Sequence, residues 1–166
     1  IFSVLQIQSK EVLICRMIAD LLNPRGQHGA GAEYLKIFLR DCLGMEKMDT
    51  KLADQAIVTA EYAIDDERRI DIVIEIGSYF LPIEVKIYAA DQKSQCFDYY
   101  QYAKRRDAQA KVYYLTLDGH RPGKDSTSSG SQSVPEEDIV CLSFREHILN
   151  WLKACKSCEN TGMVPI

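Results

Sequence analysis

The sequence contains no hydrophobic run that approaches the ~20 residues of a membrane-spanning helix. Its first residues also lack the basic segment and apolar stretch of a secretory leader. No internal repeat is present, and a length of 166 residues fits one domain with a sizeable core. We therefore expect a cytoplasmic protein without membrane contact, folded as a single domain over residues 1–166.

The six cysteines lack the spacing of a disulfide framework or a zinc site. Cys15, Cys42 and Cys96 lie in helical apolar patterns, which is typical of small buried hydrophobic residues. Cys155 and Cys158 form a C-x-x-C pair, but no second pair is nearby, and a structural zinc site normally needs four ligands. The cysteines therefore predict neither disulfides nor zinc.

Lysine and arginine (20 residues) are fewer than aspartate and glutamate (24 residues), so the net charge is −4. This balance argues against a protein that coats nucleic acid through positive potential alone. It does not exclude a nuclease, because a carboxylate-rich metal site is negative until its cation binds. The basic cluster Lys104–Arg106 could follow phosphate groups or could be a solvated helix surface, and both interpretations stay open.

The spacing of apolar residues predicts the order of the helices and strands. The expected elements are two helices (10–22 and 31–44), three strands (56–64, 70–76 and 79–87), a helix (90–108), a strand (111–119) and a C-terminal segment (141–155) that ends as an amphipathic helix. Residues 120–138 are rich in serine, glycine and proline, and we expect a mobile surface loop there.

Short turns join the three central strands, so these strands should be antiparallel neighbours. The strand–helix–strand unit that follows should make the strand from Lys111 parallel to the strand from Tyr79. The expected fold is therefore α/β, with a mixed central sheet flanked by helices.

Charged residues interrupt two of these strands, in the segment RRIDIVIEIGSYFLPIEVKI at residues 68–87. Glu84 and Lys86 project from one face of their strand, and hairpin pairing can bring Asp71 beside them. A buried charge costs several kcal/mol unless it is paired or binds a metal. The pattern therefore fits a site for a hard cation such as Mg²⁺, or alternatively a solvent-facing charge ladder across the hairpin. Glu61 could also approach Asp71, but we assign it no role.

Asp71, followed after twelve residues by Glu84-Val85-Lys86, resembles the D…(D/E)-x-K signature of the PD-(D/E)XK nuclease superfamily. Ile70 replaces the proline of that signature. The predicted order matches the restriction-endonuclease-like αβββαβ core of the family, once an extra helix in the N-terminal region and a C-terminal helix are allowed. The resemblance covers about residues 5–155, and several segments are similar to one bacterial branch of the family.

The resemblance implies a nuclease that hydrolyses phosphodiester bonds with Mg²⁺ or Mn²⁺, on DNA, in defence or DNA processing. Asp71, Glu84 and Lys86 would be the catalytic residues. Asp71, Glu84 and the backbone carbonyl of Val85 would bind the metal, and Glu11 would add a further carboxylate. Lys86 would orient the attacking water or stabilise charge on the phosphoryl oxygens.

The helix after the Glu84 strand carries Gln95-x-x-x-Tyr99, which is similar to the Q-x-x-x-Y motif of RecB-type members. By this resemblance, both side chains would contact metal-bound water or the DNA backbone. Plain helix packing is the alternative for this pair, and a favourable position in the first helical turn is the alternative for Glu11.

The alternative function is a catalytically inactive module that keeps the fold and binds nucleic acid or protein. A homodimer is possible under either interpretation.

Overall fold

The computed structural model describes residues 2–161, and for residues 2–5 and 160 it describes the backbone alone. The helices are α1 (Phe2–Leu22), α2 (Glu33–Asp41), α3 (Thr50–Asp54), α4 (Gln95–Arg106), α5 (Lys124–Thr127) and α6 (Leu149–Thr161). The strands are β1 (Ile57–Ala63), β2 (Arg69–Ile76), β3 (Tyr79–Lys86), β4 (Val112–Thr116), β5 (Ser128–Ser129), β6 (Gln132–Ser133) and β7 (Ile139–Ser143).

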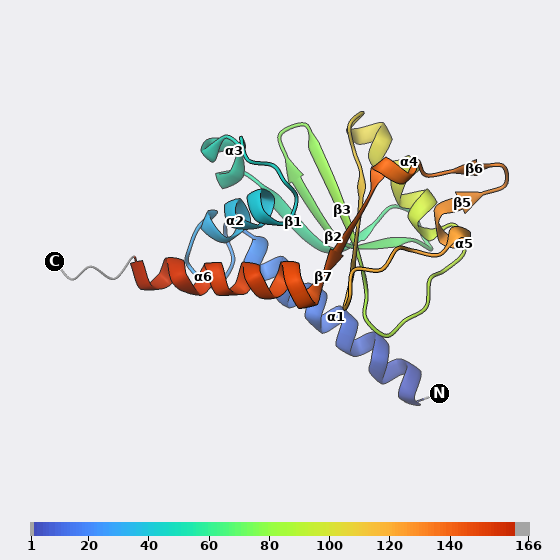
Figure 1. The fold of residues 1–166 in the computed structure, drawn as a ribbon, viewed down its shortest axis with the longest axis horizontal. Coiled ribbons are helices and arrows are strands. Elements are labelled where there is room, and N and C mark those ends of the chain that lie inside the picture. Colours follow the sequence, from blue (N-terminus) through green and yellow to red (C-terminus); the bar gives the residue numbers. More distant parts are fainter. Residues whose placement is uncertain (1, 162–166) are drawn as a thin grey trace.

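A five-stranded mixed sheet with the order β1-β2-β3-β4-β7 forms the centre of the fold (Figure 1). β1, β2 and β3 are antiparallel neighbours, whereas β4 runs parallel to β3 and β7 runs parallel to β4. The prediction of an α/β fold with a mixed sheet flanked by helices is therefore confirmed. So are the antiparallel arrangement of the first three strands and the parallel crossover through α4.

The two-residue turn at Gly77-Ser78 sets the register of the central hairpin. Gly77 has φ +54, a left-handed conformation that glycine adopts without the steric cost of a Cβ atom. Because the turn pairs Ile76 with Tyr79, the ladder continues to the pair Ile72–Ile83. The next residues along the two strands are Asp71 and Glu84, which therefore lie opposite each other.

The structure also contains elements that the sequence did not predict. β7 is a full strand of the sheet, whereas we expected no strand in the C-terminal segment that ends as a helix. α1 begins at Phe2 rather than at residue 10, and α3 was not predicted. The expected loop at residues 120–138 contains α5 and the β5–β6 hairpin, and it buries Ser126 and Val134. Its mobility stays a prediction.

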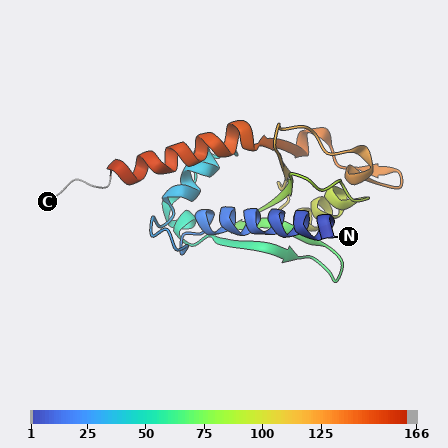
Figure 2. The same cartoon turned by 90° about the horizontal axis from the view of Figure 1, so that it is seen from below.

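Helices cover both faces of the sheet. α1, α2 and α6 pack on one face, where the main hydrophobic cluster includes Ile72, Ile74 and Ile76 of β2 (Figures 1 and 2). α4 packs on the other face and buries Val73 together with Phe80. A helix therefore covers the strand face that also carries Asp71. The alternative of a solvent-facing charge ladder across the hairpin is wrong, because Glu84 and Lys86 are buried.

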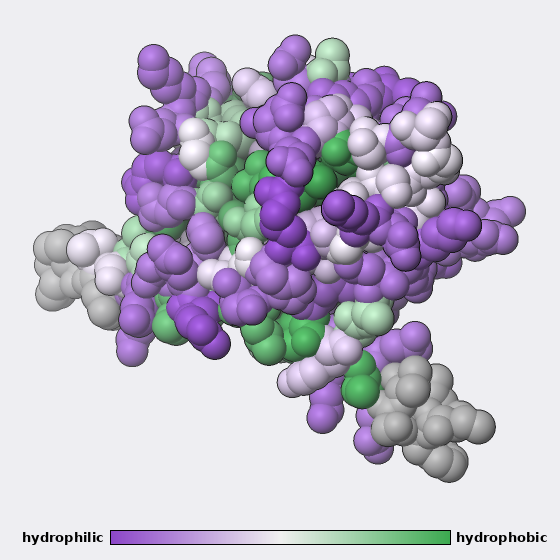
Figure 3. Space-filling model, turned by 45° about the vertical axis from the view of Figure 1, so that its right-hand side comes forward, coloured by the Kyte–Doolittle hydropathy of each residue, from purple (hydrophilic) through white to green (hydrophobic). Residues whose placement is uncertain are grey.

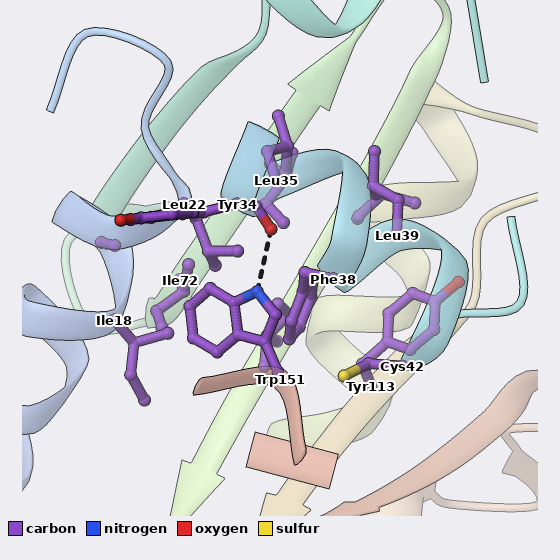
Figure 4. Close-up of a cluster of buried hydrophobic side chains, with 14 of the residues drawn as sticks. Ile18, Leu22, Tyr34, Leu35, Phe38, Leu39, Cys42, Ile72, Tyr113 and Trp151 are labelled. Carbon is purple, nitrogen blue, oxygen red and sulfur yellow. Dashed lines mark hydrogen bonds between the residues drawn. The ribbon is translucent and has the colours of Figure 1, made fainter. Parts of the chain in front are cut away.

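Trp151 of α6 lies in the middle of the main cluster and is fully buried (Figure 4). Its indole Nε1 donates a hydrogen bond of 2.8 Å to the backbone carbonyl of Tyr34, and its ring meets the ring of Phe38 edge to face. A buried indole N–H needs such a partner, so this bond fixes α6 against α2. The two helices thereby form one platform behind the sheet.

Figure 3 shows one face on which hydrophilic residues dominate and hydrophobic residues form a few separate groups, which is ordinary for a water-facing surface. Among the helices that the structure describes, none combines the length and the hydrophobicity that a bilayer crossing demands.

Candidate functional site

Asp71 and Glu84 meet where the β2–β3 ladder ends. Asp71 Oδ2 accepts a hydrogen bond of 2.8 Å from the backbone N–H of Val85. The ladder pairs recorded between β2 and β3 stop at Ile72–Ile83, so the side chain of Asp71 satisfies an N–H group just beyond them. The predicted approach of Asp71 to the Glu84 strand is therefore present, and a hydrogen bond holds it.

Glu84 and Lys86 form a buried ion pair. Lys86 Nζ lies 3.2 Å from Glu84 Oε1, and the two side chains are 8% and 2% exposed. Removing a lysine and a glutamate from water costs several kcal/mol per ion, and a single contact at this distance does not fully compensate the cost. A fold that keeps both groups buried therefore stores unfavourable electrostatic energy at this point.

Burial governs the protonation of the two carboxyl groups. Burial is the main cause that raises the pKa of Asp71, and the Val85 hydrogen bond and the Lys86 charge oppose the increase. Burial and then the neighbouring Asp71 charge raise the pKa of Glu84 well above its ordinary value, a change that Lys86 reduces without cancelling. The two carboxyl groups therefore influence each other, and the charge of Asp71 makes Glu84 harder to ionise.

Two buried acceptor atoms in this region lack a hydrogen-bond partner within the described part of the chain. They are Glu84 Oε2 and Gln95 Oε1. Buried polar atoms in folded proteins are nearly always satisfied, and an exception calls for a missing proton donor, water or ion. Carboxylate and amide oxygens are ligands that Mg²⁺ and Mn²⁺ prefer, and Asp71 offers a further carboxylate in the same region. The residues present therefore fit a hard divalent cation.

Glu11 and Glu61 direct their carboxylates to other partners. Glu11 Oε1 accepts backbone hydrogen bonds from residues 87–89. Glu61 Oε2 accepts two hydrogen bonds from the Arg16 side chain, of 3.1 Å from Nε and 2.7 Å from Nη2. Accordingly, residues 2–161 hold no group of three or more histidine, cysteine, aspartate or glutamate side chains arranged around a metal position. Asp71 and Glu84 are the acidic pair at the centre, and Mg²⁺ commonly uses only one or two protein carboxylates.

Glu61 has an unusual backbone. It stands opposite Asp71 in the β1–β2 register, between the pairs Ala60–Ile72 and Tyr62–Ile70, and its φ is +54. A left-handed glutamate inside a strand costs about 1–2 kcal/mol, so the surrounding structure must compensate this conformation. Sequence parity placed Glu61 near Asp71, but it gave no sign of the strained backbone or of the ion pair with Arg16.

Gln95 and Tyr99 connect α4 to the start of β2. Gln95 Nε2 donates to the Tyr99 hydroxyl at 3.1 Å, and this hydroxyl donates to the backbone carbonyl of Arg69. Tyr99 is buried, and its hydroxyl is committed to these two partners. These two hydrogen bonds fix the backbone at Arg69, two residues before Asp71. Gln95 Oε1 takes no part in them and has no partner among the described residues. The predicted contacts of both residues with substrate stay predictions.

Replacing Tyr99 with phenylalanine should lower the free energy of unfolding by about 1–3 kcal/mol, because the Arg69 carbonyl and the Gln95 amide lose a buried partner. Urea unfolding measures this effect. Tyr100→Phe is the matched control on the same helix, since it removes a hydroxyl bound to Asp138 instead. An unchanged stability of Tyr99→Phe, together with a large rise in KM for nucleic acid, would instead indicate a direct substrate contact.

A cleft of about 310 Å³ contains the acidic pair, Lys86 and Gln95. Its rim includes Arg68 and Arg69, which sequence reasoning did not assign to the site. Arg68 binds Asp98, the side chain of Gln92 and the backbone carbonyl of Lys93, and it thereby fastens the segment before α4 to the start of β2. The remaining lining residues are Gln8, Glu11, Val12, Glu61, Glu67, Val85, Ala89, Gln92 and Tyr99.

The basic cluster Lys104–Arg106 has partners on the protein itself. Lys104 pairs with Asp138, and Arg106 pairs with Glu75 at 2.8 Å and lies over the ring of Phe80. None of the three is among the residues that line the cleft. The structure therefore favours the helix-surface interpretation of this cluster over a path for phosphate groups.

Comparison with known proteins gives one match. The sequence matches the family model described as the PD-(D/E)XK nuclease superfamily over residues 1–163. Searches of curated proteins and of solved structures gave no match. The matched range contains every residue of the cleft and all the strands of the central sheet.

Proposed function

Because this chain belongs to the PD-(D/E)XK nuclease superfamily and has its restriction-endonuclease-like fold, we propose that it is a metal-dependent nuclease that hydrolyses phosphodiester bonds in DNA. One observation carries the proposal: Glu84 is buried, its Oε2 has no partner among the described residues, and Asp71 and Lys86 lie beside it. A divalent cation would satisfy this oxygen and offset the buried negative charge.

Asp71, Glu84 and the backbone carbonyl of Val85 are the proposed ligands of Mg²⁺ or Mn²⁺. Glu11 is a further candidate, because it lines the same cleft and its recorded hydrogen bonds all converge on Oε1. When bound, the ion supplies a Lewis acid that polarises the scissile phosphate and lowers the pKa of a water molecule.

Lys86 is the proposed group that stabilises charge in the transition state. Its Nζ is held at Glu84 Oε1 in a site with little access to water, where a positive charge acts more strongly than it would in bulk solvent. Gln95 places a free amide oxygen in the same cleft, which suits it to orient a water molecule. Tyr99 would keep Gln95 in place through the hydrogen bond to its amide.

DNA is the proposed substrate, and defence or DNA processing the proposed setting. Arg69, which is exposed and lines the cleft, offers positive charge for the phosphate backbone, whereas Arg68 is paired with Asp98. We further propose the cytoplasm as the compartment, since all six cysteines are free, as expected where thiols stay reduced. A homodimer remains a proposal that sedimentation can test.

The proposal can be tested with the purified protein and a panel of substrates. Supercoiled plasmid, linear duplex, single-stranded DNA and single-stranded RNA are incubated with Mg²⁺ or Mn²⁺, and a chelator provides the control. We expect cleavage of DNA that disappears with the chelator, and calorimetry should show binding of Mn²⁺ to the protein alone. Absence of both results would overturn the assignment and favour the inactive binding module.

A further inference from the structure

Three consecutive backbone N–H groups converge on one oxygen atom directly after Lys86. The N–H groups of Ile87, Tyr88 and Ala89 donate to Glu11 Oε1 at 2.9, 2.7 and 3.0 Å. We call residues 87–89 the amide nest. Glu11 lies on α1, 76 residues before Ile87, so this arrangement is a tertiary contact and no local turn produces it.

Successive N–H groups that point to one position form a concave site for an anion. Hydrogen bonds from such donors to an ionised oxygen are shorter and about twice as strong as those between neutral groups. These N–H groups bind an oxygen atom that carries negative charge. Both a carboxylate oxygen and a phosphate oxygen meet this requirement. The Glu11 carboxylate therefore stands where a phosphate oxygen would fit.

The position of the amide nest connects it to the cleft. Ala89 lines the cleft together with Lys86 and Glu11. Tyr88 is exposed, and Ile87 and Ala89 are half-buried, so water can reach these N–H groups when Glu11 moves away. The fold therefore does not need a carboxylate at this point to satisfy buried donors, and the nest can exchange one anion for another.

We propose that the amide nest is a binding subsite for a backbone phosphate of the nucleic acid and that Glu11 occupies it in the free protein. The proposal rests on the proposed nuclease function for the identity of the phosphate, but not for the existence of the site. A phosphate bound there lies next to Lys86 along the chain and is a neighbour of the scissile phosphate. Its arrival displaces the Glu11 carboxylate, which is then free within the cleft that it already lines.

The experiment uses metal-free protein and inorganic phosphate, with backbone amide chemical shifts as the readout. In Glu11→Ala the nest has no resident carboxylate, so phosphate should bind at least tenfold more tightly than to the wild type and should shift the amides of residues 87–89. Glu11→Gln keeps a neutral acceptor on the same stem, and its affinity should lie between the other two. Glu46→Ala, an exposed glutamate outside the cleft, is the matched control and should behave as the wild type does.

Equal phosphate affinities in all the proteins, or shifts that spare residues 87–89, would overturn the proposal. If Glu11→Ala proves poorly folded, the comparison of Glu11→Gln with the wild type decides the question by the same readout. A separate titration of the wild type with Mn²⁺ tests the nuclease proposal independently of the amide nest. If Mn²⁺ binds but the variants show no phosphate response, the amide nest is not a phosphate site and the nuclease proposal stands. If phosphate binds as expected but Mn²⁺ does not bind, the amide nest is a phosphate site and the nuclease proposal fails.

Discussion

Replacing Lys86 with methionine is expected to lower the rate of metal-dependent DNA cleavage by about a hundredfold to a thousandfold, the usual effect of losing one positioned charge at a transition state. Methionine has a similar length and keeps the apolar contacts of the lysine stem. The variant loses only the ammonium group that lies 3.2 Å from Glu84 Oε1. The measurement is single-turnover cleavage at saturating Mg²⁺ or Mn²⁺.

Saturating metal is essential to this comparison. The Lys86 charge lowers the pKa of Glu84, so its removal raises this pKa further and weakens metal binding at a given pH. Once the metal is saturating, the remaining loss of rate reports on the transition state alone.

Two companion variants sharpen the result. Lys111→Met makes the same change at an exposed lysine outside the cleft and should cleave as the wild type does. Lys86→Arg keeps the charge but not the shape, and a planar guanidinium cannot replace a compact ammonium in a closely packed site. We expect it to remain strongly impaired. Cleavage by Lys86→Met within threefold of the wild-type rate would show that Lys86 has no catalytic role.

Replacing Glu84 with glutamine should flatten the dependence of stability on pH and abolish stabilisation by metal. Burial raises the pKa of Glu84 in the folded protein well above its value in the unfolded chain. The folded state therefore binds the proton more tightly, and this contribution to stability is complete below the unfolded pKa. It is lost as the pH rises toward the folded pKa, at most at about 1.4 kcal/mol per pH unit for one proton.

Glutamine resembles the protonated form of Glu84, because both present a carbonyl oxygen and a hydrogen-bond donor. The two proteins should therefore have similar stability in acid, and the wild type should fall behind Glu84→Gln as the pH rises. Urea unfolding over a pH series without metal measures the difference. A constant difference between the two proteins at every pH would contradict the raised pKa.

Metal should reverse this order. An ion that binds only the folded state stabilises the wild type by about 2.7 kcal/mol at a concentration one hundred times its Kd. Glu84→Gln lacks the central carboxylate and should show no such gain and no cleavage. Glu137→Gln, at an exposed position, is the control for the loss of one negative charge. If metal stabilises Glu84→Gln as much as the wild type, the proposed site is in the wrong place.

Both predictions follow from one property of the site, which is a glutamate that the fold buries at a cost in stability. A buried glutamate whose ionisation lowers the stability of the protein is a poor structural residue. It is, however, a suitable ligand for a cation that binds the ionised form. The fold compensates the cost through the extensive hydrophobic packing on both faces of β2 and β3.

The sequence by itself determined four of the five strands of the sheet and the central triad of Asp71, Glu84 and Lys86. The two-residue turn at Gly77-Ser78 and the alternation of side chains along a strand are local properties, and together they place Asp71 opposite Glu84 with Lys86 on the same face. The strand–helix–strand order likewise requires the parallel pairing of β3 with β4. β7 escaped this reasoning because its five residues carry no periodicity that distinguishes them from the start of the following helix.

Only the tertiary structure decided how this triad is surrounded. The burial of Glu84, the bond of Tyr99 to the Arg69 carbonyl and the placement of Glu11 in the amide nest all depend on how α1 and α4 pack against the sheet. These contacts join residues 30 to 76 positions apart, and a pattern with a period of two or of 3.6 residues carries no information about such distances. The sequence thus predicted which charged groups would meet, and the packing of the helices decided how deeply those groups are buried and which hydrogen bonds they make.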